Sequence, residues 1–333
     1  MSWLKAGAGQ PLLKPFVRAL ERAGSRRANL LRIVTYHDID STSRFDEQLS
    51  YLARKYHIVG LSDVREAFTG RRPLPPRAMM ITFDDAYASF ATLAWPLLRT
   101  AGLPVTLFVP TGFPDSQLSF WWDRLRHAVE TTAASHAGPH PLRTPADRAW
   151  ALKQLKNEVK RLPHDEGMQL VDRLEHSLLP SGAHVPCRVL GWSELRRLAG
   201  EGVTLAAHSR SHPRLDRVAP DRALREIRQS LEDLERETGA APPALAYPDG
   251  GFDEGVETSA HEAGIELAFT TCRGTNDLTR CNPLRLRRIH VVPEEPLELF
   301  RARLAQSSVW LNRWHRFPET TLPRPPHSTA GGA

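Results

Sequence analysis

The chain has little cysteine, with three in 333 residues and none in a C-x-x-C arrangement. Cys187, Cys272 and Cys281 are sparse and irregularly spaced, which argues against a disulfide framework and fits a reducing compartment. No run approaches about 18 apolar residues, so we expect no transmembrane helix. The first 27 residues also lack the continuous apolar region of a signal peptide. These absences predict a cytoplasmic protein.

The chain also has no dense cluster of Lys and Arg residues. Lys and Arg outnumber Asp and Glu by 44 to 38, giving a net charge of +6, but no Lys/Arg-rich block contains interleaved aromatics. We therefore expect no nucleic-acid partner, and an anionic glycan or lipid headgroup is the better candidate for attraction to the positive charge. The hydrophobic fraction of 41% supports a sizeable core.

Residues 1–29 form a basic segment in which apolar residues recur at helical spacing. Leu12, Phe16 and Leu20 illustrate the apolar series, and Arg18 and Arg22 lie among them. This pattern fits either a helix packed on the rest of the protein or an amphipathic segment at the inner face of a membrane. Peripheral membrane contact is therefore an expectation, and recovery of the protein in a clean periplasmic fraction would contradict it.

From residue 30 onward, apolar runs alternate with amphipathic runs. Predicted strands cover residues 30–36, 58–59, 78–83, 105–109, 203–207, 244–247, 267–271 and 286–292. Predicted helices cover residues 45–55, 86–100, 193–199, 221–238, 253–263 and 297–305. About eight strand–helix units imply parallel strands and a distorted (β/α) barrel over residues 30–310. The Pro/Gly/Ser-rich tail, residues 311–333, is predicted to be disordered.

A charged, helical stretch over about residues 120–190 interrupts this rhythm and is interpreted as an insertion after a barrel strand. It opens with Trp121, Trp122 and Asp123. Paired aromatics near a barrel mouth either stack on a sugar ring or anchor the inserted helices. We expect Arg124 and Arg126 to be surface charges.

The strand over residues 78–83 ends abruptly on two adjacent carboxylates, Asp84 and Asp85. Two neighbouring negative charges need a cation or a shared proton, although a pair of helix N-cap residues is a simpler explanation. In a parallel barrel, catalytic groups collect at the C-terminal ends of strands. Other predicted strands are followed there by further polar groups, namely His37, His208, His212 and Asp249. Arg288 and His290 lie within the predicted strand over residues 286–292, and His290 is for that reason the weaker candidate for a catalytic role.

His208 and His212 together with one carboxylate match a catalytic zinc site. Three protein ligands leave a position for water, and a bound dication lowers the pKa of that water and polarises a carbonyl oxygen. The second Asp can then accept a proton, and a His on the opposite side can protonate a leaving amine. These parts suffice for amide hydrolysis.

Three motifs at these positions resemble the NodB-homology polysaccharide deacetylases of carbohydrate esterase family 4. They are TFDD at residues 82–85, HSRSH at residues 208–212, and Tyr-Pro-x-Gly at residues 247–250. The resemblance covers roughly residues 30–300 apart from the insertion. It implies a distorted (β/α) barrel, a divalent metal that is usually zinc, and hydrolysis of N-acetyl groups on amino sugars.

The resemblance also implies roles for individual residues. Asp84 corresponds to the base that acts on metal-bound water as the water attacks the amide carbonyl. Asp85, His208 and His212 correspond to the metal ligands. The general acid is a His, and the chain's Tyr-His-Asp strand resembles exopolysaccharide deacetylases in which the N-terminal His serves, so His37 is favoured over His290.

The third motif departs from the family pattern Arg-x-Pro-Tyr-Gly. Ala246 replaces the Arg that orients the base, and Tyr247 and Asp249 occupy the positions that contact the substrate or oxyanion. The oxyanion donor would be the main-chain amide of Asp249, which does not depend on side-chain identity. Arg288, on another strand, is a candidate to replace the missing Arg.

This set of residues is compatible with three functions. The first is a metal-dependent N-deacetylase acting on a polysaccharide or on its lipid-linked or soluble precursor. The second is a hydrolase of a small linear or cyclic amide on the same barrel. The third is a non-catalytic glycan-binding protein. A base beside a metal site favours an enzyme, and the shape of the cleft separates polymer from small-molecule substrates.

Overall fold

The computed structural model describes residues 28–179, 185 and 188–306. The expected amphipathic segment and the expected disordered tail therefore lie essentially outside the described residues, as does Cys187. Cys272 and Cys281 are free thiols. None of the helices in the described part of the chain has both the length and the apolar character needed to cross a membrane.

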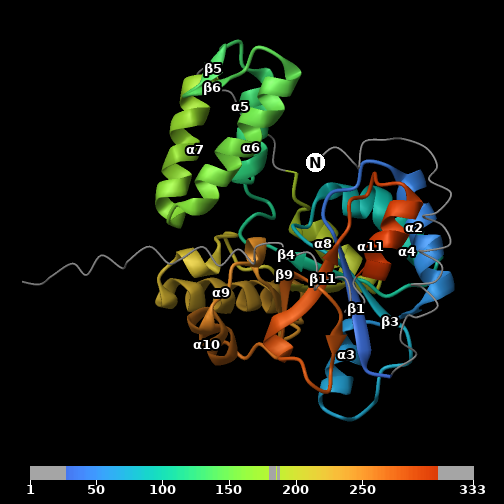
Figure 1. The fold of residues 1–333 in the computed structure, drawn as a ribbon. Helices are drawn as coiled ribbons and strands as arrows, with labels where there is room; N and C mark the ends of the chain where they lie inside the picture. The colour runs from blue at the N-terminus through green and yellow to red at the C-terminus, as the bar shows by residue number, and fades with distance from the viewer. Residues whose placement is uncertain (1–27, 180–184, 186–187, 307–333) are drawn as a thin grey trace, which may run out of the picture.

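Seven parallel strands form a closed barrel at the centre of the molecule (Figure 1). Around the ring they are β1 (Leu30–Tyr36), β11 (Leu286–His290), β9 (Leu267–Arg273), β8 (Ala244–Ala246), β7 (Thr204–Ala207), β4 (Thr106–Val109) and β3 (Ala78–Phe83). Pairing of β1 with β3, from Leu31 opposite Ala78 to Tyr36 opposite Phe83, closes the ring. The predicted (β/α) barrel is confirmed.

The ring contains seven strands and not the eight suggested by the sequence. The predicted strand at residues 58–59 corresponds to β2 (His57–Ile58), which pairs only with the first residues of β3. β4 pairs with the end of β3, at Thr82 and Phe83. Because β1 covers the other edge of β3 along its whole length, β2 and β4 share one edge and β2 stays outside the ring. The short β10 (Asn276–Asp277) pairs antiparallel with β1.

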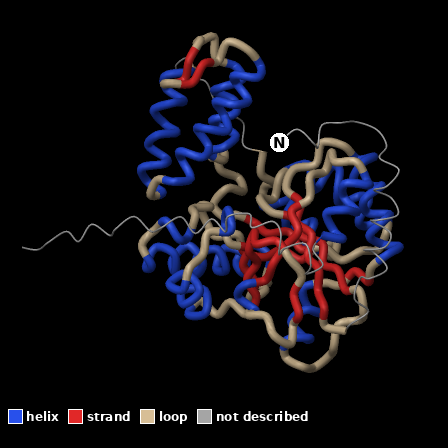
Figure 2. The backbone as a smooth tube through the Cα atoms, in the orientation of Figure 1, coloured by secondary structure: helices blue, strands red, loops and turns tan. Residues whose placement is uncertain are grey.

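Helices cover the outside of the barrel (Figures 1 and 2). They are α2 (Thr42–Lys55), α3 (Leu61–Phe68), the π-helix η1 (Phe90–Ala94), α4 (Trp95–Thr100), α8 (Trp192–Gly200), α9 (Pro220–Thr238), α10 (Glu254–Glu262) and α11 (Leu297–Gln306). Short 3₁₀ turns are η2 (Leu215–Arg217), η3 (Pro248–Gly250) and η4 (Pro283–Arg285).

The inserted segment forms a separate group of helices above the barrel, drawn in green in Figure 1. It consists of α5 (Trp121–Thr131), a hairpin of β5 (His136–Ala137) and β6 (His140–Pro141), α6 (Pro145–Arg161) and α7 (His164–Leu178). The three helices enclose an apolar core of their own, which includes Leu125, Leu155 and Val171.

Alternate residues of the strands face opposite sides, as the period of two in a β-strand requires. Met80, Phe108 and Phe269 belong to the cluster that fills the barrel, whereas Ile81 and Phe83 belong to the larger cluster between the strands and the outer helices. The barrel interior is therefore packed through its lower part, and polar groups are confined to the mouth.

The helix after β3 begins later than predicted. Asp85 and Ala86 both have left-handed backbone, with φ of 70° and 50°, so no helix can start at Ala86. Helical residues begin at Ala88, and η1 follows from Phe90. Because of this turn, the side chains of Asp84 and Asp85 point in different directions.

Candidate active site

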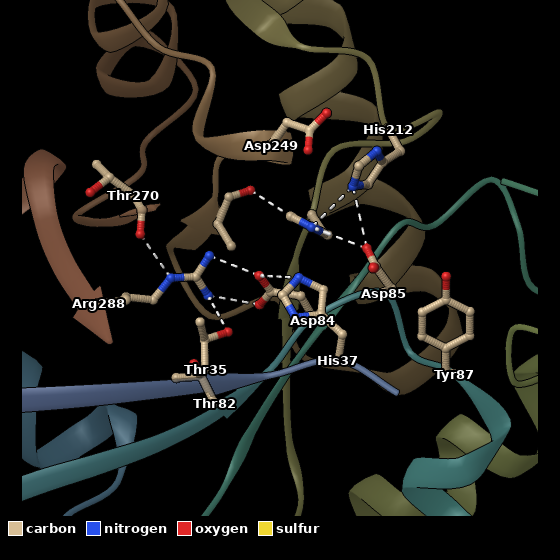
Figure 3. Close-up of polar contacts among 12 residues, drawn as sticks. Thr35, His37, Thr82, Asp84, Asp85, Tyr87, His212, Asp249, Thr270 and Arg288 are labelled. Carbon is tan, nitrogen blue, oxygen red and sulfur yellow. Dashed lines mark hydrogen bonds and ion pairs between the residues drawn. The ribbon is translucent and has the colours of Figure 1, made fainter. Parts of the chain in front are cut away.

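Asp84 is the centre of the barrel mouth, directly after the last residue of β3. Its carboxylate is 2% exposed and accepts two hydrogen bonds from Arg288, from Nη1 at 2.7 Å and Nη2 at 2.8 Å (Figure 3). Burial would raise the pKa of Asp84, but the charge of Arg288, followed by His208 and His37, lowers it below its usual value. Asp84 is thus held ionised and in one orientation.

Arg288 is itself completely enclosed, on the inner face of β11. Its Nε donates to the carbonyl oxygen of Thr270 at 2.9 Å, and its Nη1 also donates to Thr35 Oγ1 at 3.1 Å. Arg288 therefore contacts both neighbouring strands, β9 and β1, and the residue that directly follows β3. This places an Arg on Asp84 although Ala246 occupies the usual position of the orienting Arg.

Asp85, His208 and His212 converge on one point beside Asp84. Asp85 Oδ1 lies 3.4 Å from His208 Nε2 and 3.3 Å from His212 Nε2, and the two nitrogens are 3.2 Å apart. All three residues are buried. Neither Asp84 nor Asp85 caps a helix in the structure, so the N-cap explanation of the acid pair is wrong.

The three donor atoms fit a divalent metal. Two ligand atoms about 2.0 Å from a tetrahedral ion lie roughly 3.3 Å apart, which matches all three separations. His208 Nδ1 is 2.7 Å from the carbonyl oxygen of Ala246 and donates to it, which leaves the Nε2 lone pair for an ion. Among the described residues, the buried Oδ1 of Asp85 has no hydrogen bond. Its charge is nonetheless favoured, because the two histidines outweigh burial and lower the pKa of Asp85.

Left-handed backbone is concentrated around this mouth. Besides Asp85 and Ala86, three residues at the ends of other strands have φ between 52° and 59°: Ser209, His212 and Asp249. Such conformations cost free energy in residues other than glycine and persist where the surroundings demand them. Here they turn the loops after β3, β7 and β8 towards the same cavity (Figure 3).

The two candidate acids lie side by side on the opposite side of Asp84. His37 Nε2 is 3.8 Å from Asp84 Oδ2, and the His37 side chain is 35% exposed. His290 is the last residue of β11 and not an interior strand residue, and its ring is 5.1 Å from that of His37. Desolvation in the cleft, followed by the charge of His37, lowers the pKa of His290 to about 4.

The loop after β8 is fastened tightly next to the metal ligands. Asp249 forms an ion pair of 2.7 Å with Lys160 of α6, and its pKa is lowered by this lysine in spite of burial. A Cβ at Gly250, which has a φ of 68°, would meet Thr271 Oγ1 at 2.0 Å, so only glycine fits. Tyr247 borders the cleft, but its side chain is buried and its hydroxyl donates to the Leu284 carbonyl. The Tyr247 hydroxyl is therefore not available to a substrate.

An aromatic wall stands on the other side of the triad. Trp122 stacks on Phe120 with ring centroids 4.3 Å apart, and its Nε1 donates to the Tyr87 hydroxyl at 2.8 Å. That hydroxyl in turn donates to Asp123 at 3.0 Å. Trp122 also approaches His212, at 4.9 Å between ring centroids. Trp122 therefore anchors the start of α5 and also lines the cleft, and its stacking on a sugar ring stays a prediction.

These groups enclose a cleft of about 360 Å³ that extends from the triad towards the inserted helices. The cleft is also lined by four basic residues that were not predicted from the sequence to belong to the site: Arg126, Lys156, Lys160 and Arg188. Arg126 was expected on the surface, and it is exposed but borders the cleft. Lys156 and Lys160 lie four residues apart on α6. Residues at this spacing share a face of a helix, so the sequence could have indicated that the two lysines point the same way.

The seven-stranded barrel, with an Asp-His-His cluster beside a second carboxylate at its mouth, forms a candidate hydrolase site. The profile of the polysaccharide deacetylase family matches residues 71–268, which is more than half of the chain. The chain belongs to this family, whose members are hydrolases of carbon–nitrogen bonds other than peptide bonds.

One curated relative is the poly-β-1,6-N-acetyl-D-glucosamine N-deacetylase of Escherichia coli K12, which is 39% identical over 72 residues. That match covers 21% of this chain and 11% of the relative, so the chain aligns with only a small part of it.

Solved deacetylases have the same fold. PplD of Streptococcus pyogenes, determined with acetate, superposes with a TM-score of 0.55 at 18% identity, covering 84% of this chain and 97% of that chain. IcaB of Ammonifex degensii gives a TM-score of 0.55 at 16% identity over 84% of this chain and 96% of that chain. The deacetylase domain of BpsB from Bordetella bronchiseptica gives 0.52 at 17% identity over 79% and 96%.

Proposed function

We propose that this protein is a metal-dependent hydrolase that removes N-acetyl groups from amino sugars of a polysaccharide or of its lipid-linked or soluble precursor. The observation that carries the proposal is the buried Asp84 carboxylate, fixed by Arg288 at 2.7 and 2.8 Å next to a three-ligand cluster. The name of the Escherichia coli relative, an N-deacetylase of a poly-N-acetylglucosamine, supports the same chemistry.

The chain's own groups divide the reaction between them. A divalent ion held by Asp85, His208 and His212, most simply zinc, would polarise the acetamide carbonyl and lower the pKa of a water molecule. Asp84 accepts a proton from the attacking water, because it is ionised and positioned beside the triad.

The remaining steps use groups on the rim of the mouth. The main-chain amide of Asp249, on the tight turn after β8, would donate to the carbonyl oxygen as negative charge develops on it. His37 donates a proton to the leaving amine of the sugar. It lies beside Asp84, at 3.8 Å, and is more accessible than the base itself.

Replacing His37 is expected to reduce activity far more than replacing His290. Because its pKa is about 4, His290 is neutral at pH 7 and has no proton of the required acidity to donate. We expect His37→Ala to lower kcat by roughly 100- to 1,000-fold, in the range of general acid catalysis. His290→Ala is the matched control and should cost about tenfold or less. An equal decrease of kcat in the two variants, measured by acetate release, would contradict the assignment of His37 as the general acid.

Metal removal tests the proposed function directly. Dialysis of the full-length protein against a chelator is expected to abolish acetate release from N-acetylglucosamine oligomers, and one equivalent of Zn²⁺ should restore it. Asp85→Ala should fail to recover metal or activity, because it deletes one of the three donors. Metal content is measured by elemental analysis. A metal-loaded protein that releases acetate from no acetylated sugar would instead favour a hydrolase of small amides.

A further inference from the structure

The inserted helices present positive charge to the active-site cleft. Arg126 of α5 and Lys156 and Lys160 of α6 line the cleft together with Arg188, which follows the insertion. They line the same cleft as Trp122 and the three metal-ligand candidates. A substrate that reaches the triad therefore passes a basic surface.

Most charges in the cleft are already paired. Lys160 is paired with Asp249 at 2.7 Å, and Arg188 is paired with Asp38. Asp84 is paired with Arg288, and Asp85 belongs to the triad. The carboxylates near the barrel are thus committed to particular partners and do not neutralise the rest of the basic wall.

Lys156 is the exception. The side chain is half-buried, and it forms no hydrogen bond or ion pair with any other residue in the described part of the chain. Desolvation, followed by repulsion from Arg126 and Lys160, lowers the pKa of its amine to about 8. A half-buried ammonium group without a partner is destabilised until an anion reaches it.

The nearby acid does not remove this excess. Asp123 is 7% exposed, and burial raises its pKa, which disfavours its charged form. Its Oδ2 accepts the Tyr87 hydroxyl, and its Oδ1 forms a long ion pair of 3.9 Å with Arg126, whose side chain is 45% exposed and so keeps access to the cleft. Lys156 and Arg126 together therefore offer positive charge to the cleft, and a neutral N-acetylated glycan would leave it unused.

We propose that the substrate carries an anionic group, a phosphate or a carboxylate, close to the N-acetylated sugar, and that Lys156 and Arg126 form the subsite that binds it. This inference rests on the proposed deacetylase function and specifies its substrate class. Charge-assisted hydrogen bonds from Lys and Arg suit the oxygens of either group. The phosphate would come from a sugar linked to a phosphate or diphosphate carrier, and the carboxylate from a neighbouring uronic acid.

The test compares acetate release from substrates that differ only in the anionic group. They are a neutral N-acetylglucosamine oligomer, the same oligomer with a 1-phosphate, and an oligomer of equal length containing a uronic acid. We expect kcat/KM of the wild type to be at least about tenfold higher for one anionic substrate than for the neutral one. The preferred anion identifies its source, and equal values for all three would overturn the proposal.

Variants of α6 separate a specific subsite from a general effect of charge. Lys156→Gln should lower the ratio of kcat/KM between anionic and neutral substrates about tenfold, and Lys156→Arg should restore most of it. Lys153→Gln is the matched control, because Lys153 is exposed on the same helix and does not line the cleft. An equal fall of the ratio in Lys153→Gln would contradict the assignment to Lys156.

Direct binding distinguishes failure of this inference from failure of the proposed function. Calorimetric titration of the wild type and Lys156→Gln with N-acetylglucosamine 1-phosphate and with N-acetylglucosamine requires no turnover. Preferential binding of the phosphate that depends on Lys156, without acetate release from any substrate, would support the subsite and refute the deacetylase. Acetate release without any anion preference in turnover or binding would support the deacetylase and refute the subsite.

Discussion

Asp84→Asn is expected to retain its metal and to lose acetate release by roughly 1,000-fold or more, at the upper end of general base contributions. The amide has nearly the same shape as the carboxylate but cannot accept a proton. Asp84 contributes no atom to the cluster formed by Asp85, His208 and His212. Metal content and acetate release, measured on the same preparation, check both parts of the expectation.

The matched control is Asp85→Asn, which has the same change in charge at the neighbouring position. It should lower metal affinity, because the donor oxygen of Asp85 lies 3.3 and 3.4 Å from the two histidine nitrogens. Both variants are compared by thermal unfolding, since Asp84→Asn also weakens the contact with Arg288. Metal loss in Asp84→Asn with metal retention in Asp85→Asn would reverse the two roles.

Arg288→Met is expected to lower the free energy of unfolding by about 3–5 kcal/mol at pH 7, as for other buried ion pairs that lose one partner. The side chains of Arg288 and Asp84 are 1% and 3% exposed, so the substitution leaves a carboxylate in the barrel without its counter-ion. Activity should fall with stability, because the orientation and the ionisation of the base both depend on Arg288. Urea denaturation measures the loss.

The loss should depend on pH in a defined direction. In the wild type, Arg288 holds the pKa of Asp84 below its usual value. The ion pair therefore stabilises the fold fully at a pH above the usual pKa, and this stabilisation is lost as the pH falls through the lowered pKa. Without Arg288, burial raises the pKa of Asp84 above the unfolded value of about 3.9. The penalty of the variant is then greatest at high pH. The difference in unfolding free energy between wild type and Arg288→Met should therefore narrow as the pH is lowered from 7.

A double variant supplies the control for this pair. Arg288→Met combined with Asp84→Asn removes both charges and should recover part of the stability lost in Arg288→Met alone. Two results would show that the ion pair is not a principal contact of the barrel mouth. One is a loss of unfolding free energy below about 1 kcal/mol in Arg288→Met. The other is a loss in the double variant that exceeds the sum of the losses in the two single variants.

Much of the fold follows from local patterns in the sequence. β1 and β3 have the predicted boundaries, and most of the other barrel strands differ from prediction by one or two residues. Buried strands of a parallel barrel are continuous apolar runs, and they end where polar residues follow. The positions of Asp84, Asp85, His208 and His212 were predictable for the same reason, since each follows the end of a strand.

Other features depend on contacts between segments distant in sequence. β2 reads as a barrel strand, yet β1 pairs directly with β3 and leaves it outside the ring. Tyr247 occupies a motif position, yet its side chain is packed inward. The direction of Lys156 depends on how the insertion docks on the barrel, because helical periodicity defines a face but not the surface that it meets.

The motifs and apolar runs of the chain are enough to predict its family, the succession of its strands and the residues at the strand ends. The contact between Arg288 and Asp84, which 204 residues separate, follows from the three-dimensional packing. So does the place of Lys156 in the cleft, where it has no ion-pair partner among the described residues. The physical reason is that a guanidinium or an ammonium group can extend from any neighbouring strand or helix. Its partner is selected by closure of the barrel and by packing of the insertion, and neither is encoded in a local motif.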